Sequence, residues 1–113
     1  MYVIGVPFHS MVFIESAVFT RQVKELLTED SYAEFQQCLA AHPQLGDVIQ
    51  GTGGLRKVRW SIKGSGKSGG VRVIYFHVVA KAQVRLLLIY RKGVKDNLTA
   101  AEKKVLRKLN ADW

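Results

Sequence analysis

The sequence predicts a single α+β domain with the element order β-α-α-β-β-β-α, in which an αα-hairpin packs on a mainly antiparallel four-stranded sheet. Three observations support this class. The 113 residues leave room for one modest core. A short β-branched run near the N-terminus is followed by two stretches with apolar residues at helical spacing. Three runs rich in β-branched and aromatic residues come next, and the short connection between the last two favours antiparallel pairing.

Local signals set the bounds of these elements. Ser16 is the expected N-cap of the first helix, and Ser31 with Glu34 matches a capping box for the second. Thr99 with Glu102 is another capping box, which opens a C-terminal helix. In chain order, the expected elements are a strand at 11–14, helices at 17–27 and 31–41, strands at 55–60, 71–79 and 84–91, and a helix from Thr99.

Residues 1–10 stand outside this pattern. They lack the charged region and the long apolar core of a signal peptide, and Met11 begins the first expected strand. We therefore expect residues 1–10 to be a dispensable extension and residues 11–113 to be the folded domain. No apolar run approaches the length of a transmembrane helix, and the single cysteine, Cys38, is compatible with a reducing compartment. We expect a cytoplasmic protein without a membrane partner.

Positive charge is concentrated in residues 48–95. This stretch of 48 residues holds eleven of the 17 Lys/Arg and none of the nine Asp/Glu, so the remainder of the chain is slightly acidic. A sheet that gathers positive charge without internal counter-charge must find its anions elsewhere. Nucleic acid, an anionic membrane surface and an acidic protein all fit this balance, and we expect RNA or DNA first.

Strand alternation selects a few of these cations. Lys57 and Arg59 fall on one face of their strand. Arg72 opens the next strand, and Arg91 and Lys92 end the last one. In an antiparallel meander these positions converge on one concave face, where arginines grip a phosphate with forked hydrogen bonds.

The sequence gives less support to nucleotide-triphosphate binding, nucleophilic catalysis or metal binding. Gly66-Lys67-Ser68 resembles the end of a phosphate-binding P-loop, but the glycine required five positions earlier is Ser61, and the loop leads into a strand. No Ser, Cys or Thr lies in a nucleophile elbow. The potential metal ligands share no ligand spacing: His9, His42, His77 and Cys38. We therefore expect neither a metal nor a cofactor.

Three segments resemble the HigB-like branch of the RelE/ParE toxin superfamily. They are LGDVIQGTGGLRKVRW at residues 45–60, KGSGKSGGVRVIYF at 63–76 and LLLIYRKGVKDNLT at 86–99. The resemblance implies the toxin of a type II toxin–antitoxin module, which enters the ribosomal A site and cuts mRNA. Cleavage there proceeds by attack of the ribose 2′-hydroxyl on the adjacent phosphate. The expected partners are the ribosome, mRNA and an antitoxin that resembles HigA, a helix-turn-helix protein.

The resemblance also implies roles for single residues. The positions that match catalytic ones are Lys57, Arg59, Arg72 and Lys92. Arg72 is expected to grip the phosphate, and Lys57 is a candidate base because neighbouring cations disfavour its protonated form. Lys92 or Lys95 is the candidate proton donor to the leaving oxygen. Arg59 stands where RelE has a lysine proposed as base, and arginine holds its proton, so the base stays open. The residues expected to contact RNA or the ribosome are Arg56, Lys63, Lys67, Tyr90, Arg91 and Lys95.

Two other functions stay open on the same fold. ParE-type relatives inhibit DNA gyrase and do not cut RNA, although the cations on the second and third expected strands argue against that activity. A non-catalytic RNA-binding module is the other alternative, and it predicts steep salt dependence with no cleaved ends.

Overall fold

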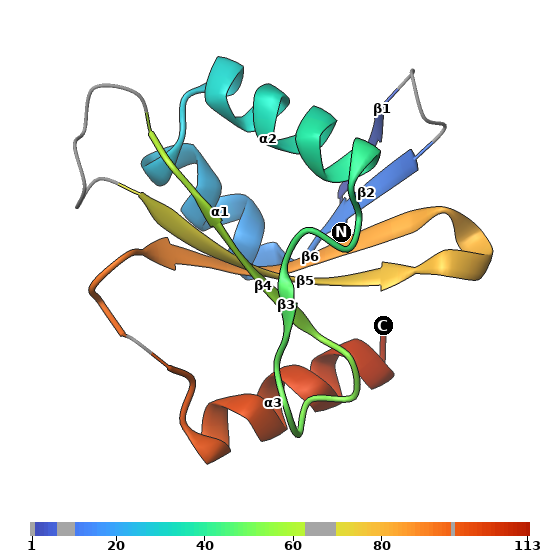
Figure 1. The fold of residues 1–113 in the computed structure, drawn as a ribbon, viewed down its shortest axis with the longest axis vertical. Coiled ribbons are helices and arrows are strands. Elements are labelled where there is room, and N and C mark those ends of the chain that lie inside the picture. Colours follow the sequence, from blue (N-terminus) through green and yellow to red (C-terminus); the bar gives the residue numbers. More distant parts are fainter. Residues whose placement is uncertain (1, 7–10, 63–69, 96) are drawn as a thin grey trace.

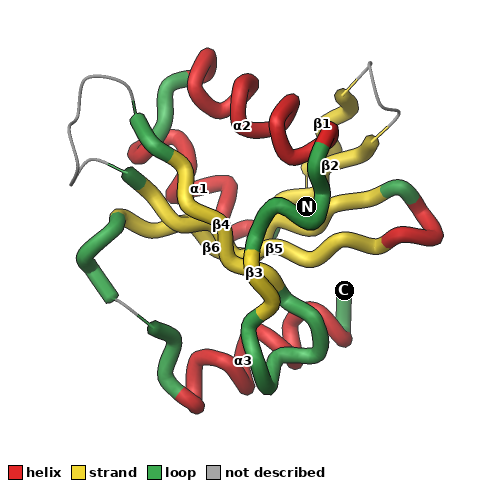
Figure 2. Tube along the Cα trace, in the orientation of Figure 1, coloured by secondary structure: helices red, strands yellow, loops and turns green. Residues whose placement is uncertain are grey.

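The computed structural model describes residues 2–6, 11–62, 70–95 and 97–113. These described residues form three layers, with a six-stranded sheet between an αα-hairpin on one face and one C-terminal helix on the other (Figures 1 and 2). None of the helices in these ranges is long and apolar enough to span a bilayer. The elements are β1 (Tyr2–Val6), β2 (Met11–Glu15), α1 (Ala17–Leu26), α2 (Glu29–Ala41), β3 (Asp47–Val48), β4 (Arg56–Trp60), β5 (Val71–Val78), the 3₁₀ turn η1 (Val79–Lys81), β6 (Gln83–Arg91) and α3 (Ala100–Ala111).

The sheet has the strand order β1-β2-β6-β5-β4-β3, in which β2 and β6 are parallel and the other neighbours are antiparallel. The α+β class and the mainly antiparallel sheet are therefore confirmed, but the prediction of four strands is wrong. One added strand, β1, lies within residues 1–10 and pairs with the whole of β2. The other, β3, is two residues long and pairs with the start of β4. Both are held by pairing with a neighbour, which local sequence patterns do not reveal.

The helix caps agree with the sequence at two of three places. The Ser16 hydroxyl accepts the N–H of Phe19 at 3.0 Å, and Thr99 forms the expected capping box. The predicted Ser31 capping box is wrong, because Thr28 is the N-cap and its hydroxyl accepts the N–H of Ser31 at 3.1 Å. The helix thus starts earlier, which places Glu29 and Asp30 in its first turn, where the helix dipole favours acidic side chains.

Apolar side chains form one core on each face of the sheet. The core beneath α1 and α2 includes Phe13, Phe19, Phe35, Leu39, Val73 and Leu86. The core beneath α3 includes Leu55, Ile74, Leu87, Tyr90, Leu98 and Leu106. The two helical layers therefore bury opposite faces of the same central strands, β5 and β6.

A β-bulge in β6 decides which face its last residues occupy. Ile74 pairs with Leu88 whereas Tyr75 pairs with Leu86, so Leu87 is the additional residue. Leu87 and Leu88 both pack on the α3 side, and the alternation is shifted by one residue beyond them. Tyr90 consequently faces α3. Ser16 stabilises the bulge, because its hydroxyl donates to the Leu87 carbonyl at 2.8 Å.

Candidate functional site

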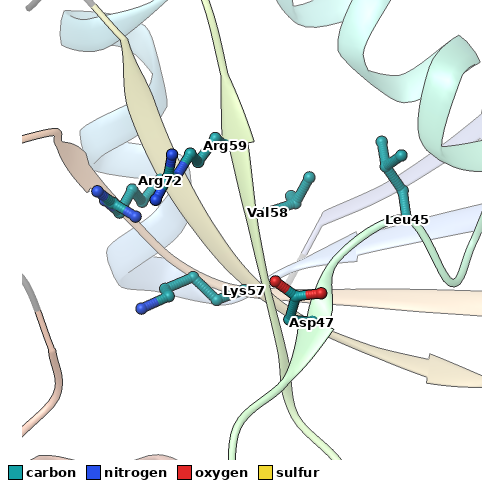
Figure 3. A pocket seen from close by; sticks show the side chains of 6 residues that line it. All are labelled: Leu45, Asp47, Lys57, Val58, Arg59 and Arg72. Atoms are coloured by element: carbon teal, nitrogen blue, oxygen red, sulfur yellow. The ribbon is translucent and has the colours of Figure 1, made fainter.

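Three polar side chains lie side by side across the α3 face of the sheet. Arg59 on β4 is paired with Arg72 on β5, and Arg72 is paired with Tyr90 on β6. Directly opposed residues on neighbouring strands lie within side-chain contact distance. Figure 3 shows Lys57, Arg59 and Arg72 extending to the same side of β4, whereas Val58 points away from them. Lys57 precedes Arg59 by two residues on β4 and therefore lies on the same face. We call the four residues Lys57, Arg59, Arg72 and Tyr90 the cationic row.

Two hollows open along the cationic row. The residues around the larger one, of about 580 Å³, are Leu45, Asp47, Lys57, Val58, Arg59 and Arg72. The residues around the smaller one, of about 180 Å³, are Arg59, Trp60, Ser61, Gly70, Val71, Arg72 and Lys92. Arg59 and Arg72 belong to both hollows. The four residues that the sequence singles out for catalysis, Lys57, Arg59, Arg72 and Lys92, therefore surround one connected surface.

Arg72 is buried although it carries a full charge. The residue is only 7% exposed, and its Nε has no hydrogen-bond partner among the described residues. The ion pairs in that part of the chain also leave Arg72 without a carboxylate. A buried guanidinium is costly unless hydrogen bonds and an opposite charge compensate it. The structure therefore leaves at Arg72 a donor that is suited to an anionic ligand.

Tyr90 adds a second buried donor at the same place. It is 8% exposed, and within the described ranges its hydroxyl has no hydrogen-bond partner. Burial raises the pKa of the Tyr90 phenol above its usual value, although the positive charges of Arg72 and Lys95 act in the opposite direction. The phenol therefore keeps its proton at neutral pH and can donate it in a hydrogen bond. Two adjacent buried donors without acceptors are uncommon in folded proteins.

Other cations expected at the site have different positions. Arg56 lies on the opposite face of β4, and its Nη1 donates to the Gly46 carbonyl at 2.7 Å. Lys95 forms an ion pair with Glu102 in the first turn of α3. Its Nζ lies 5.9 Å from the centre of the Tyr90 ring, so Lys95 borders the cationic row with its charge already balanced. Lys63 and Lys67 lie outside the described residues.

The expectation that Arg91 converges with Lys92 is wrong. Arg91 is the cross-strand partner of Val71, which belongs to the core beneath α1 and α2. It therefore lies on the far face of β6 from Tyr90, because consecutive strand residues point to opposite faces. Lys92 follows the end of the strand, and its backbone N–H donates to the Gly70 carbonyl at 2.9 Å. This bond holds Lys92 beside the start of β5, where Arg72 lies.

Asp47 is a residue of the site that sequence reasoning missed. It lines the larger hollow beside Lys57, Arg59 and Arg72, and it is the cross-strand partner of Lys57 (Figure 3). Its position is one residue before the stretch 48–95 from which acidic residues are absent. The pairing of β3 with β4, which brings Asp47 to the cations, has no local sequence signal.

Gly46 allows β3 to approach β4 closely. A Cβ atom at this position would lie 2.8 Å from the Lys57 carbonyl oxygen and 2.9 Å from the Tyr75 ring. The Gly46 N–H donates to the Tyr75 hydroxyl at 2.9 Å, and that hydroxyl donates to the Pro43 carbonyl at 2.8 Å. The backbone before Asp47 is therefore fixed against β4 and β5, which shapes the larger hollow.

The chemistry of the site is that of phosphate recognition. Two guanidinium groups offer forked donors, Lys57 and Lys92 supply ammonium groups, and Asp47 supplies an acceptor. In the described ranges, no three His, Cys, Asp or Glu side chains are grouped as metal ligands. Comparison of the sequence with models of known protein families finds no match.

Proposed function

We propose that this chain is the toxin of a type II toxin–antitoxin module and acts as a ribosome-dependent mRNA endoribonuclease. The observation that carries the proposal is the buried Arg72 guanidinium, whose Nε has no acceptor among the described residues. A phosphodiester group in the adjoining hollows would bring the missing negative charge to Arg72, which lines both of them. The resemblance of residues 45–60, 63–76 and 86–99 to HigB-like toxins points to the same ligand, RNA.

The proposed reaction needs a proton acceptor, a proton donor and stabilisation of negative charge. The 2′-oxygen attacks phosphorus and loses its proton, while the bond from phosphorus to the 5′-oxygen breaks and that oxygen gains a proton. The products are a 2′,3′-cyclic phosphate and a 5′-hydroxyl end. Arg72 and Arg59 stabilise the charge that develops on the non-bridging oxygens, because both border the two hollows.

The lining of the two hollows supports a proposed assignment of the proton-transfer roles. Lys57 and Asp47 both line the larger hollow, so either is placed to accept the 2′-hydroxyl proton. Lys92 lines the smaller hollow and is the proposed donor to the 5′-oxygen, because Lys95 lines neither hollow of the cationic row. The proposal puts the protein in the cytoplasm, with the ribosome and mRNA, and requires a HigA-like antitoxin to neutralise it.

Expression with mapping of mRNA ends tests the proposal. Wild-type protein is expected to arrest growth and to produce 5′-hydroxyl ends within translated mRNA. Arg72→Ala is expected to lower the cleavage rate at least about 100-fold, as loss of a preorganised charge donor at a transition state does. Arg91→Ala is the matched control, because Arg91 is exposed on the opposite face of the sheet.

The alternatives predict different results in the same experiments. Inhibition of gyrase supercoiling with translation intact would identify a ParE-like gyrase inhibitor. RNA binding with a steep salt dependence and no cleaved ends would identify a binding module. Full cleavage and growth arrest by Arg72→Ala would show that the site assignment is wrong.

A further inference from the structure

A second cationic hollow lies beside α3. It has a volume of about 490 Å³, and none of its lining residues borders either hollow of the cationic row. Its lining residues are Gln50, Gly51, Ala100, Lys103, Lys104 and Arg107. Three of these residues carry positive charge and none carries negative charge. The positive potential around α3 is therefore focused in a concave site.

The three cations occupy one face of α3. Lys103, Lys104 and Arg107 follow Ala100 at intervals of three, four and seven residues, the spacing of a single helical face. The acidic residues of this region are engaged elsewhere, since Glu102 pairs with Lys95 and Asp112 pairs with Lys108. Within the described ranges, the basic face of α3 thus has no carboxylate of its own. Like charges four residues apart, such as Lys103 and Arg107, destabilise a helix. A bound polyanion would offset this repulsion.

The turn between β3 and β4 forms the opposite wall and keeps the hollow open. Gly51 and Gly53 have φ angles of +78° and +75°, a backbone conformation that favours glycine. A Cβ atom at Gly51 would meet no other atom within 4 Å, so the backbone there borders open space. A Cβ atom at Gly53 would lie 3.7 Å from Arg107 Nε, which shows that the Arg107 side chain rests against this turn. Arg107 is thereby held at the hollow.

The hollow beside α3 is close in sequence to the larger hollow of the cationic row. Gly51 borders the α3 hollow, and Lys57 in the cationic row follows six residues later. Six residues span at most about 22 Å. We propose that the basic face of α3 binds the phosphate backbone of RNA outside the segment that is cut. The inference rests on the proposed function for the identity of the polyanion, and it adds a second docking surface.

Salt-dependent RNA binding tests the inference. The probe is a fluorescein-labelled single-stranded RNA with 2′-O-methyl groups throughout, which cannot be cleaved by 2′-hydroxyl attack. The slope of log affinity against log salt concentration is expected to fall by about 2 in K103A/K104A/R107A, since each lost phosphate contact removes about 0.7. The control K81A/R21A/K24A removes the same charge from exposed positions on η1 and α1 and is expected to keep the wild-type slope.

Equal loss of slope in both triple variants would overturn the inference, because general charge would then explain the effect. An unchanged slope in the α3 variant would overturn it as well. Alanine favours helix, so α3 is expected to persist, and thermal unfolding checks this. If the alanine variant unfolds early, K103Q/K104Q/R107Q repeats the binding measurement with longer side chains.

Cleavage on ribosomes separates this inference from the proposed function. The α3 variant is expected to need more ribosomes for half-maximal cleavage while keeping the rate at saturation. If wild-type protein cleaves nothing but the α3 variant shows the reduced slope, the nuclease proposal fails and the docking surface stands. If wild-type protein cleaves mRNA and the slope is unchanged, the docking surface fails and the nuclease proposal stands.

Discussion

Arg72 illustrates a conflict between stability and binding at a single residue. Its charge is buried, and its Nε has no hydrogen-bond partner in the described part of the chain. Such a group destabilises the free protein and becomes favourable only when an anion binds. An Arg72→Met substitution keeps an unbranched apolar chain and removes the charge. We expect it to abolish RNA cleavage and to stabilise the fold by about 1 kcal/mol, which raises Tm by about 4 °C.

Thermal unfolding followed by circular dichroism measures the change in Tm. Arg59→Met is the matched control, because Arg59 belongs to the same row but is exposed. It is expected to reduce cleavage while changing stability by less than about 0.5 kcal/mol. A fall in Tm for Arg72→Met would mean that the guanidinium supports the fold and is not reserved for a ligand.

Tyr90 allows a separate test of the second buried donor. Its raised pKa keeps the phenol protonated through neutral pH, so the hydroxyl is a donor that lies buried beside Arg72. Tyr90→Phe leaves the ring in the core beneath α3 and removes only that donor. We expect unchanged or slightly higher stability, and cleavage slowed about 10- to 100-fold, the value of a hydrogen bond to a charged group.

Single-turnover cleavage by ribosome-bound protein measures the Tyr90 effect. Tyr2→Phe serves as a control for the chemical change, because Tyr2 is on β1 at the far edge of the sheet. Wild-type cleavage by Tyr90→Phe would assign the tyrosine to the core alone.

At the scale of elements, β3 is the small strand on which the larger hollow depends. Gly46→Ala would place a Cβ atom 2.8 Å from the Lys57 carbonyl oxygen, so β3 or β4 has to move. We expect this substitution to lower stability by about 1–3 kcal/mol and to reduce cleavage, because Asp47 and Lys57 lose their relative positions. Chemical denaturation and a cleavage assay measure the two effects.

Gly51→Ala is the control for Gly46→Ala. Gly51 has a positive φ but open space around it, so alanine there tests backbone strain without a clash. It is expected to cost about 1 kcal/mol and to leave the cleavage rate at saturating ribosome concentration at the wild-type level, because Gly51 borders the α3 hollow and not the hollows of the cationic row. A loss of cleavage in Gly51→Ala equal to that in Gly46→Ala would show that the turn, and not the close approach of β3, controls the hollow.

The elements with strong local signals were predictable from sequence. Ser16 and Thr99 mark helix starts through their own side-chain hydrogen bonds, and the apolar periodicity of the helices is independent of the sheet. Thr28 caps α2, whereas the spacing of Ser31 and Glu34, which matches a capping box, led to a predicted N-cap that is three residues too late. The strands β1 and β3 exist through pairing with a neighbour, which a linear pattern does not record.

The candidate site was predictable where strand alternation is regular. Arg59 and Arg72 face the same side because β4 and β5 pair without interruption between them. Leu86 to Ile89 are all apolar, so the sequence does not reveal the bulge at Leu87. It therefore could not show that Tyr90 lies on the face of the cationic row and Arg91 on the opposite face. Asp47 was missed because it reaches the cations through the pairing of β3 with β4.

Across the described part of the molecule, several basic residues have structural roles. Arg56 binds backbone carbonyls, and Arg85 donates to the Asn110 carbonyl at 3.0 Å, which anchors the end of α3. Lys95 is paired with Glu102. The cationic row and the basic face of α3 lie on the α3 side of the sheet, whereas α1 and α2 cover the other side (Figure 1). A polyanion is therefore expected to approach from the α3 side.

The N-terminal strand supports a prediction about the sheet as a whole. β1 forms the edge next to β2, and the cationic row lies on β4, β5 and β6. Removal of residues 1–10 is expected to leave RNA cleavage intact but to expose the β2 edge, whose unpaired backbone groups favour self-association. Size-exclusion chromatography and thermal unfolding should show a larger species and a lower Tm.

Proline substitution tests whether pairing of β1 causes these effects. Val3→Pro and Ile4→Pro, made separately, cover both phases of the hydrogen-bond ladder between β1 and β2, because proline lacks an N–H. At least one of them is expected to reproduce the behaviour of the truncated chain at full length. Loss of cleavage on truncation would show instead that β1 acts on the site through β2 and β6. Unchanged assembly and Tm would mean that β1 adds nothing to the sheet in solution, as the sequence alone predicts for residues 1–10.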